Sequence, residues 1–64
     1  MKITIERTKE TIEKEFSGKA MDLLKEIGVL VEDVLIIKNG QLVTEDEELD
    51  DSDEIKLLSV ISGG

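Results

Sequence analysis

The chain ends in the sequence Glu54-Ile55-Lys56-Leu57-Leu58-Ser59-Val60-Ile61-Ser62-Gly63-Gly64. Residues 55–61 form an apolar run with β-branched members, which predicts a strand that is buried on at least one face. A glycine pair usually serves a turn, because glycine reaches backbone angles that other residues avoid. No strand follows this pair in the sequence. We therefore expect one domain over residues 1–62 and a flexible tail over residues 63–64.

The predicted tail presents an α-carboxylate on Gly64 with little steric hindrance. Because Gly63 and Gly64 have no Cβ, such a tail can thread a narrow channel and let a reagent approach the terminal carbonyl closely. Chain ends are also commonly disordered without any function, and the glycines alone do not separate these two interpretations. The rest of the sequence has to distinguish them.

The first half of the chain has the patterns of two strands and one helix. Apolar and polar residues alternate over residues 1–6, which predicts a half-buried strand, and residues 11–16 predict a weaker second strand for which a helix is the alternative. Ser17 is the expected N-terminal cap of a helix that ends at Gly28. One face of that helix is apolar at i, i+3, i+4 and i+7, namely Ala20, Leu23, Leu24 and Ile27.

The second half has the pattern of three strands. Residues 34–37 are wholly apolar, and Asn39-Gly40 follows as a strong signal for a type I′ hairpin turn into a return strand over residues 41–43. The predicted element order is thus β-β-α-β-β-β, an α+β arrangement in which one helix packs on one mixed sheet. Since the helix separates the first hairpin from the rest, the last strand can return beside the first.

Residues 44–54 hold eight acidic residues in eleven, with Leu49 as the single apolar residue. A calcium loop is one interpretation, but the spacing and the missing glycine do not match it, so we expect no metal. We predict instead a solvated, self-repelling loop that Leu49 attaches to the core.

The composition limits the classes of function. A net charge of −8 disfavours contact with nucleic-acid phosphates and favours a basic partner protein. With Phe16 as the only aromatic residue, base stacking is excluded as well. The absence of cysteine and histidine removes thiol nucleophiles, imidazole bases and the usual zinc ligands. No apolar stretch reaches membrane-spanning length, so we expect a soluble cytoplasmic protein that does not bind membranes.

Three segments resemble those of a known family: Ile36-Ile37-Lys38-Asn39-Gly40, the approach to the last strand over residues 49–55, and the ending Val60-Ile61-Ser62-Gly63-Gly64. Together with the element order, they resemble the ubiquitin-like β-grasp fold. Within that fold the chain is similar to the ThiS/MoaD sulfur carriers, a group that includes archaeal ubiquitin-like small modifiers. The Val-Ile-x-Gly-Gly ending is closest to ThiS.

The resemblance implies a chemical role for the tail. An ATP-dependent activating enzyme would adenylate the Gly64 carboxylate, and a sulfur donor would convert it to a thiocarboxylate. Gly63 would give the tail its clearance, and Ser62 is counted with the tail. The chain would be a co-substrate with no bound cofactor, since ATP is used by the partner. The sulfur would pass to a synthase such as thiazole synthase, with thiamin-type biosynthesis favoured over molybdopterin or tRNA thiolation. In the alternative, a ubiquitin-like modifier is joined through Gly64 to target lysines. In a third interpretation, the chain is a plain binding module.

Strand parity predicts a docking surface for the activating enzyme. If Ile55 and Leu57 contact the helix, then Leu58 and Val60 face outward with Ile37 beside them, and we also assign Ile61 to this group. We expect an outward apolar patch with an acidic rim to bind a partner, as in ubiquitin-like proteins. The alternatives are that these residues cover the sheet edge or pack within a dimer.

Overall fold

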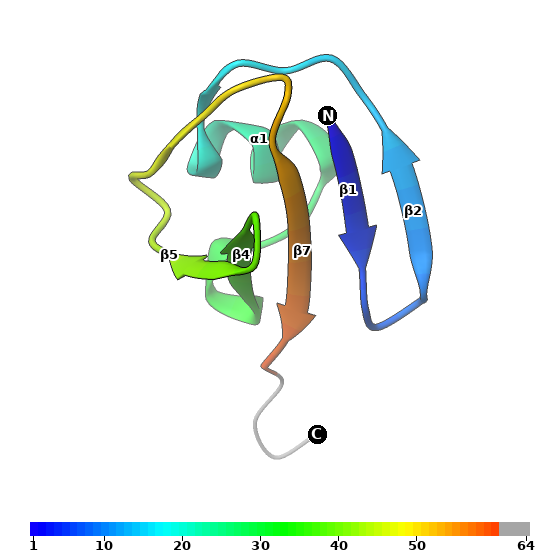
Figure 1. Ribbon diagram of the computed structural model, residues 1–64. Helices are drawn as coiled ribbons and strands as arrows, with labels where there is room; N and C mark the ends of the chain where they lie inside the picture. Colours follow the sequence, from blue (N-terminus) through cyan, green and yellow to red (C-terminus); the bar gives the residue numbers. More distant parts are fainter. Residues whose placement is uncertain (61–64) are drawn as a thin grey trace.

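A single helix covers one face of a five-stranded mixed sheet in the computed structural model, which describes residues 1–60 (Figure 1). The strands of this sheet lie in the order β2-β1-β7-β4-β5, and β3 and β6 form a separate two-stranded ladder. The elements follow one another as β1 (Lys2–Ile5), β2 (Glu10–Glu13), β3 (Gly18–Lys19), α1 (Ala20–Ile27), the 3-10 helix η1 (Val31–Asp33), β4 (Val34–Lys38), β5 (Gln41–Val43), β6 (Glu48–Leu49) and β7 (Glu54–Ser59).

The last strand, β7, lies at the centre of the sheet. It runs parallel to β1, with Ile3 opposite Ile55, and antiparallel to β4, with Ile36 opposite Leu57. The expectation that the last strand returns beside the first is therefore confirmed. The α+β fold of the ubiquitin-like β-grasp type is confirmed with it, because the helix crosses one face of a mixed sheet.

The core lies between α1 and the inner face of the sheet. The helix contributes three of the residues that its apolar spacing predicted, and the three central strands contribute alternate residues, as the period of two requires. The fully buried set is Ile3, Ala20, Leu23, Leu24, Ile36, Leu49, Ile55 and Leu57.

Two predicted turns have the backbone angles that their residues favour. Asn39 and Gly40 have φ values of 50° and 83°, as a type I′ hairpin between β4 and β5 requires. Gly28 ends α1 in the left-handed conformation with φ 76°, and the next amide, of Val29, donates to the carbonyl of Leu24 at 2.9 Å.

The predicted helix cap was wrong. Ser17 lies outside α1, because residues 18–19 are extended and pair with β6 before the helix begins at Ala20. The first helical amides donate instead to backbone carbonyls of the acidic segment: Ala20 N–H to Glu47 at 2.9 Å and Met21 N–H to Glu45 at 3.0 Å. A distant loop thus supplies the acceptors that a side-chain cap would have supplied locally.

The second strand is present, so the helical alternative does not apply, but it is shorter than predicted and covers residues 10–13. Four residues form the preceding turn, in which Lys9 takes a positive φ of 60° where no glycine is available. Phe16, which we had placed in the strand, follows it and packs against the core from the connection to β3.

Substitution of Leu49 tests whether this side chain attaches the acidic segment to the core. We expect Leu49→Ala to lower the free energy of unfolding by about 2–5 kcal/mol, because truncation of a buried leucine leaves a cavity. The matched control is Leu42→Ala, whose side chain is 62% exposed; its effect should be within about 0.5 kcal/mol. Chemical denaturation measures both, and equal losses would contradict the role given to Leu49.

Candidate functional site

The face of the sheet opposite α1 carries an apolar patch on its β4, β5 and β7 side. Leu58 alternates with the buried Leu57 and lies opposite Leu35 across the β4–β7 ladder. Ile37 alternates with the buried Ile36 and lies opposite Leu42 across the hairpin. Cross-strand partners share a face, so Leu35, Ile37, Leu42 and Leu58 lie on one surface. The exposed Val60, two residues after Leu58, extends it, and we call these five residues the open-face patch.

The exposure of this patch is unusual for large apolar side chains. Leu35 is 41% exposed, Leu42 is 62% exposed and Val60 is 39% exposed, while Leu58 and Ile37 are half-buried. Contiguous exposed apolar residues on a small protein commonly mark a binding surface.

Sequence reasoning placed Leu58, Val60 and Ile37 on this face but missed Leu35 and Leu42. Both residues follow from signals already present. Leu35 is two residues from Ile37 on the same strand, and a two-residue turn at Asn39-Gly40 sets Leu42 opposite Ile37. The hairpin signal was therefore sufficient to complete the patch.

Ile61, Ser62, Gly63 and Gly64, the other predicted site residues, lie outside the described residues. The residues just before them, Ser59 and Val60, are held in place by backbone contacts. Ser59 lies opposite Val34 at the end of the β4–β7 ladder, and the Val60 amide donates to the carbonyl of Asp33 at 2.9 Å. The last described residue is thus held against η1 at one end of the sheet.

The rim of the patch differs from the acidic one that we expected. On its β1 side, Lys56 lies opposite Ile37, and its Nζ is 3.8 Å from a Glu6 carboxylate oxygen. Lys2 and Glu54 form a second pair at 3.7 Å. Because the strands place lysines beside the carboxylates, this side of the rim carries both signs of charge.

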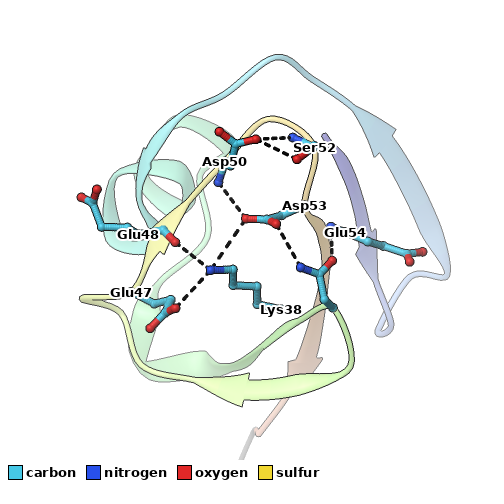
Figure 2. A network of polar contacts seen from close by, with 8 residues as sticks. Lys38, Glu47, Glu48, Asp50, Ser52, Asp53 and Glu54 are labelled. Atoms are coloured by element: carbon cyan, nitrogen blue, oxygen red, sulfur yellow. Dashed lines mark hydrogen bonds and ion pairs between the residues drawn. The ribbon is translucent and has the colours of Figure 1, made fainter.

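The acidic segment is organised around one lysine (Figure 2). Lys38 lies at the end of β4, and its Nζ donates to a Glu47 carboxylate oxygen at 3.1 Å and to the Glu48 carbonyl at 3.0 Å. An Asp53 carboxylate oxygen lies 3.8 Å from the same nitrogen. The Lys38 ammonium group therefore links the end of β4 to two parts of the acidic segment, residues 47–48 and residue 53.

Backbone and side-chain amides donate to two aspartates of the loop, Asp53 and Asp51. Asp53 accepts from the Asp50 amide at 2.7 Å (Figure 2). It also accepts from the side-chain amide of Asn39 at 2.9 Å, and the side-chain oxygen of Asn39 accepts from the Glu54 amide. Asp51 accepts from the Phe16 amide at 2.9 Å. The segment is largely solvent-exposed apart from Leu49, as predicted, but the prediction of a self-repelling loop was wrong, since a hydrogen-bond network holds the segment.

These contacts shift the acidities of the groups that make them. The hydrogen bond to Glu47, assisted by the charge of Asp53, raises the pKa of Lys38. The Asp50 amide, followed by the Asn39 side chain, lowers the pKa of the Asp53 carboxyl. Hydrogen bonds from Ser52 lower the pKa of Asp50 in the same way. Each shift favours the ionised form that the network uses.

Within residues 1–60, no group of three or more acidic side chains is arranged to hold a metal ion. The same residues contain no helix long and apolar enough to cross a membrane.

A β-grasp domain whose last strand is central, and whose open face carries an apolar patch, has the fold of the ubiquitin-like proteins. The ThiS family model matches residues 2–64, and the chain belongs to the ThiS family. Members of this family are small sulfur carrier proteins that are not enzymes themselves and that act with an activating enzyme and a sulfur-accepting partner.

The pH dependence of the melting temperature in the Asp53→Asn variant tests the hydrogen-bond network of the acidic segment. The pKa of the Asp53 carboxyl is below its ordinary value of 3.8 in the folded protein. The ionised group therefore stabilises the fold above that pH, and the contribution is lost as the pH falls through the lower, folded pKa. We expect Asp53→Asn to reduce the melting temperature at neutral pH, and the difference from the unmodified protein to shrink as the pH falls below 3.8.

The matched control is Asp46→Asn in the same loop. Within residues 1–60, the Asp46 carboxylate makes no hydrogen bond or ion pair. Its replacement should leave the melting temperature unchanged or slightly raised, because it removes one negative charge from an acidic segment. A pH-independent loss in Asp53→Asn would contradict the role of the ionised carboxylate.

Proposed function

We propose that this chain carries sulfur as a thiocarboxylate on Gly64, after activation by an ATP-dependent adenylating enzyme of the ubiquitin-activating type. A Gly64 carboxylate oxygen attacks the α-phosphorus of ATP, and pyrophosphate leaves. A sulfur nucleophile, hydrosulfide in its simplest form, then attacks the carbonyl carbon and displaces AMP. The product is a Gly64 thiocarboxylate.

The chemistry explains why the tail is glycine and why a partner is needed. A carboxylate is a poor acyl donor because its leaving group would be oxide, whereas AMP is a good leaving group. Glycine has no side chain to hinder attack at its carbonyl carbon. The chain has no histidine or cysteine, so the partner supplies the base and the nucleophile for these steps.

The observation that carries the proposal is the family match, which runs through the Gly63-Gly64 ending. The described residues add support, because Val60 is held at the end of the central strand, and residues 61–64 therefore continue from a fixed point. Within the family, the Val-Ile-x-Gly-Gly ending favours thiamin-type biosynthesis, with a synthase such as thiazole synthase accepting the sulfur in the cytoplasm.

The open-face patch is the proposed docking surface of the activating enzyme. It lies on β7 itself and on the neighbouring hairpin, so an enzyme bound there is directly beside the strand that leads to the tail. Burial of exposed leucines also gives association an apolar driving force that the surrounding charges do not provide.

Leu58→Glu tests the docking surface. A carboxylate at the centre of the patch should weaken binding of the activating enzyme about tenfold or more, since it would be desolvated without a partner. The matched control is Thr11→Glu, which adds the same charge at an exposed position of the edge strand β2. Calorimetry measures both affinities, and equal affinity for Leu58→Glu and the unmodified protein would rule out this surface.

The tail chemistry is tested by intact mass after incubation with a candidate activating enzyme, ATP and a sulfide source. We expect a gain equal to the replacement of one oxygen by sulfur, located on Gly64 by fragmentation. Deletion of Gly63 and Gly64 should abolish the gain, while the melting temperature stays the same because glycine has no side chain to pack in a core. Conjugates of higher mass that depend on Gly64, without a thiocarboxylate, would favour the protein-modifier alternative instead.

A further inference from the structure

A hollow lies at the end of the domain where β7 ends. Three segments that are far apart in the sequence form it: the turn between β1 and β2, the connection after α1, and the facing ends of β4 and β7 (Figure 1). Its lining includes Arg7, Val29, Leu30, Asp33 and Ser59.

The hollow combines an exposed apolar residue with a lone cation. Leu30 is 63% exposed, more than any other large apolar residue of the described chain. Arg7 is the only arginine in the sequence, and among residues 1–60 its guanidinium makes no ion pair. Neither residue is used in the core or in the loop network, so the fold gives no reason for their presence here.

The length of the remaining chain brings a partner to this hollow. Residues 61–64 extend at most about 14 Å beyond Val60, because a fully extended residue spans no more than 3.3–3.6 Å. The domain itself measures 34 × 22 × 22 Å. An enzyme that encloses both a nucleotide and the Gly64 carboxylate must therefore approach the end of the domain from which β7 leads, wherever else it binds.

We propose that this hollow is a second docking site for the activating enzyme, which inserts an apolar side chain against Leu30 and Val29 and places a carboxylate beside Arg7. The proposal rests on the function proposed above and names the surface that such an enzyme contacts at the base of the tail. An arginine fork binds a carboxylate in one fixed orientation. On a chain of net charge −8, this single contact would favour one orientation of the bound enzyme over others.

Asp33 gives the hollow its other charge. It lies on η1, whose Asp33 carbonyl receives the Val60 amide, whereas Arg7 lies in the turn between β1 and β2. The two charges thus come from different segments. A partner that matched both would present a carboxylate toward the turn and a cation toward η1.

The test uses Leu30→Ala and Arg7→Glu in an ATP–pyrophosphate exchange assay with a purified activating enzyme that accepts the unmodified protein. We expect KM for the carrier to rise about tenfold for each variant, because truncation or reversal of an interface contact costs binding. The maximal exchange rate should change little, since the tail is the same. The matched control for Arg7→Glu is Lys25→Glu, an equal charge change at an exposed position of α1, for which KM should stay within about twofold.

The outcomes separate this inference from the function on which it rests. If the unmodified protein supports no exchange with any activating enzyme and forms no thiocarboxylate, both proposals fail. If it supports exchange and Leu58→Glu weakens binding, but Leu30→Ala and Arg7→Glu keep the original KM, only the second docking site is ruled out. An equal rise in KM for Lys25→Glu and Arg7→Glu would show that the effect comes from net charge alone, and it would also rule out the second docking site. Melting temperatures exclude loss of the fold, because both side chains are exposed.

Discussion

The position of β7 between β1 and β4 is the constraint on which the rest of the structure depends. Its inner residues Ile55 and Leu57 are buried beneath α1 and pair with β1 and β4 at the same time. A central strand exchanges hydrogen bonds on both sides, so it belongs to the most protected part of a small domain. The same strand presents Leu58 outward and leads to Val60. The surface that is proposed to bind a partner and the origin of the tail are therefore fixed by the core itself.

A central last strand creates a second requirement, which the acidic segment meets. The chain leaves β5 at the edge of the sheet and must return to the middle, so a long connection has to cross one end of the domain. The Leu49 side chain of this connection is buried in the core, and Lys38 at the end of β4 pairs with the Glu47 and Asp53 carboxylates of the connection. The carbonyls of Glu45 and Glu47 in turn accept the first amides of α1. The connection thus caps the helix and brings the chain back to the middle of the sheet. Its high charge is compatible with an ordered conformation, because each carboxylate whose pKa is shifted accepts a hydrogen bond from a specific donor.

The parts of the fold that could be predicted from the sequence are those set by local patterns. The spacing of Leu23 and Leu24 on one helical face, the alternation around Ile55 and the Asn39-Gly40 turn each contain their own structural signal. The errors arose where distant segments meet. Ser17 has the chemistry of a cap, yet residues 18–19 pair with β6, a contact that no local pattern indicates. The network around Lys38 was missed for the same reason, since eight carboxylates suggest repulsion until the positions of Asn39, Phe16 and the loop amides are known.

The division of roles between the tail and the domain follows from the chemistry of glycine. A Gly-Gly ending offers an unhindered carboxylate but no side chain, so a partner can recognise little in it beyond its length and its charge. Under the proposed function, an activating enzyme that distinguishes this carrier from another protein with the same ending must therefore contact the domain. Two surfaces are suited to this by position: the open-face patch beside the strand, and the hollow with Leu30 and Arg7 at the base of the tail. Under the proposed function, residues 61–64 allow at most about 14 Å between Val60 and Gly64, so an enzyme that acts on Gly64 lies close to these surfaces.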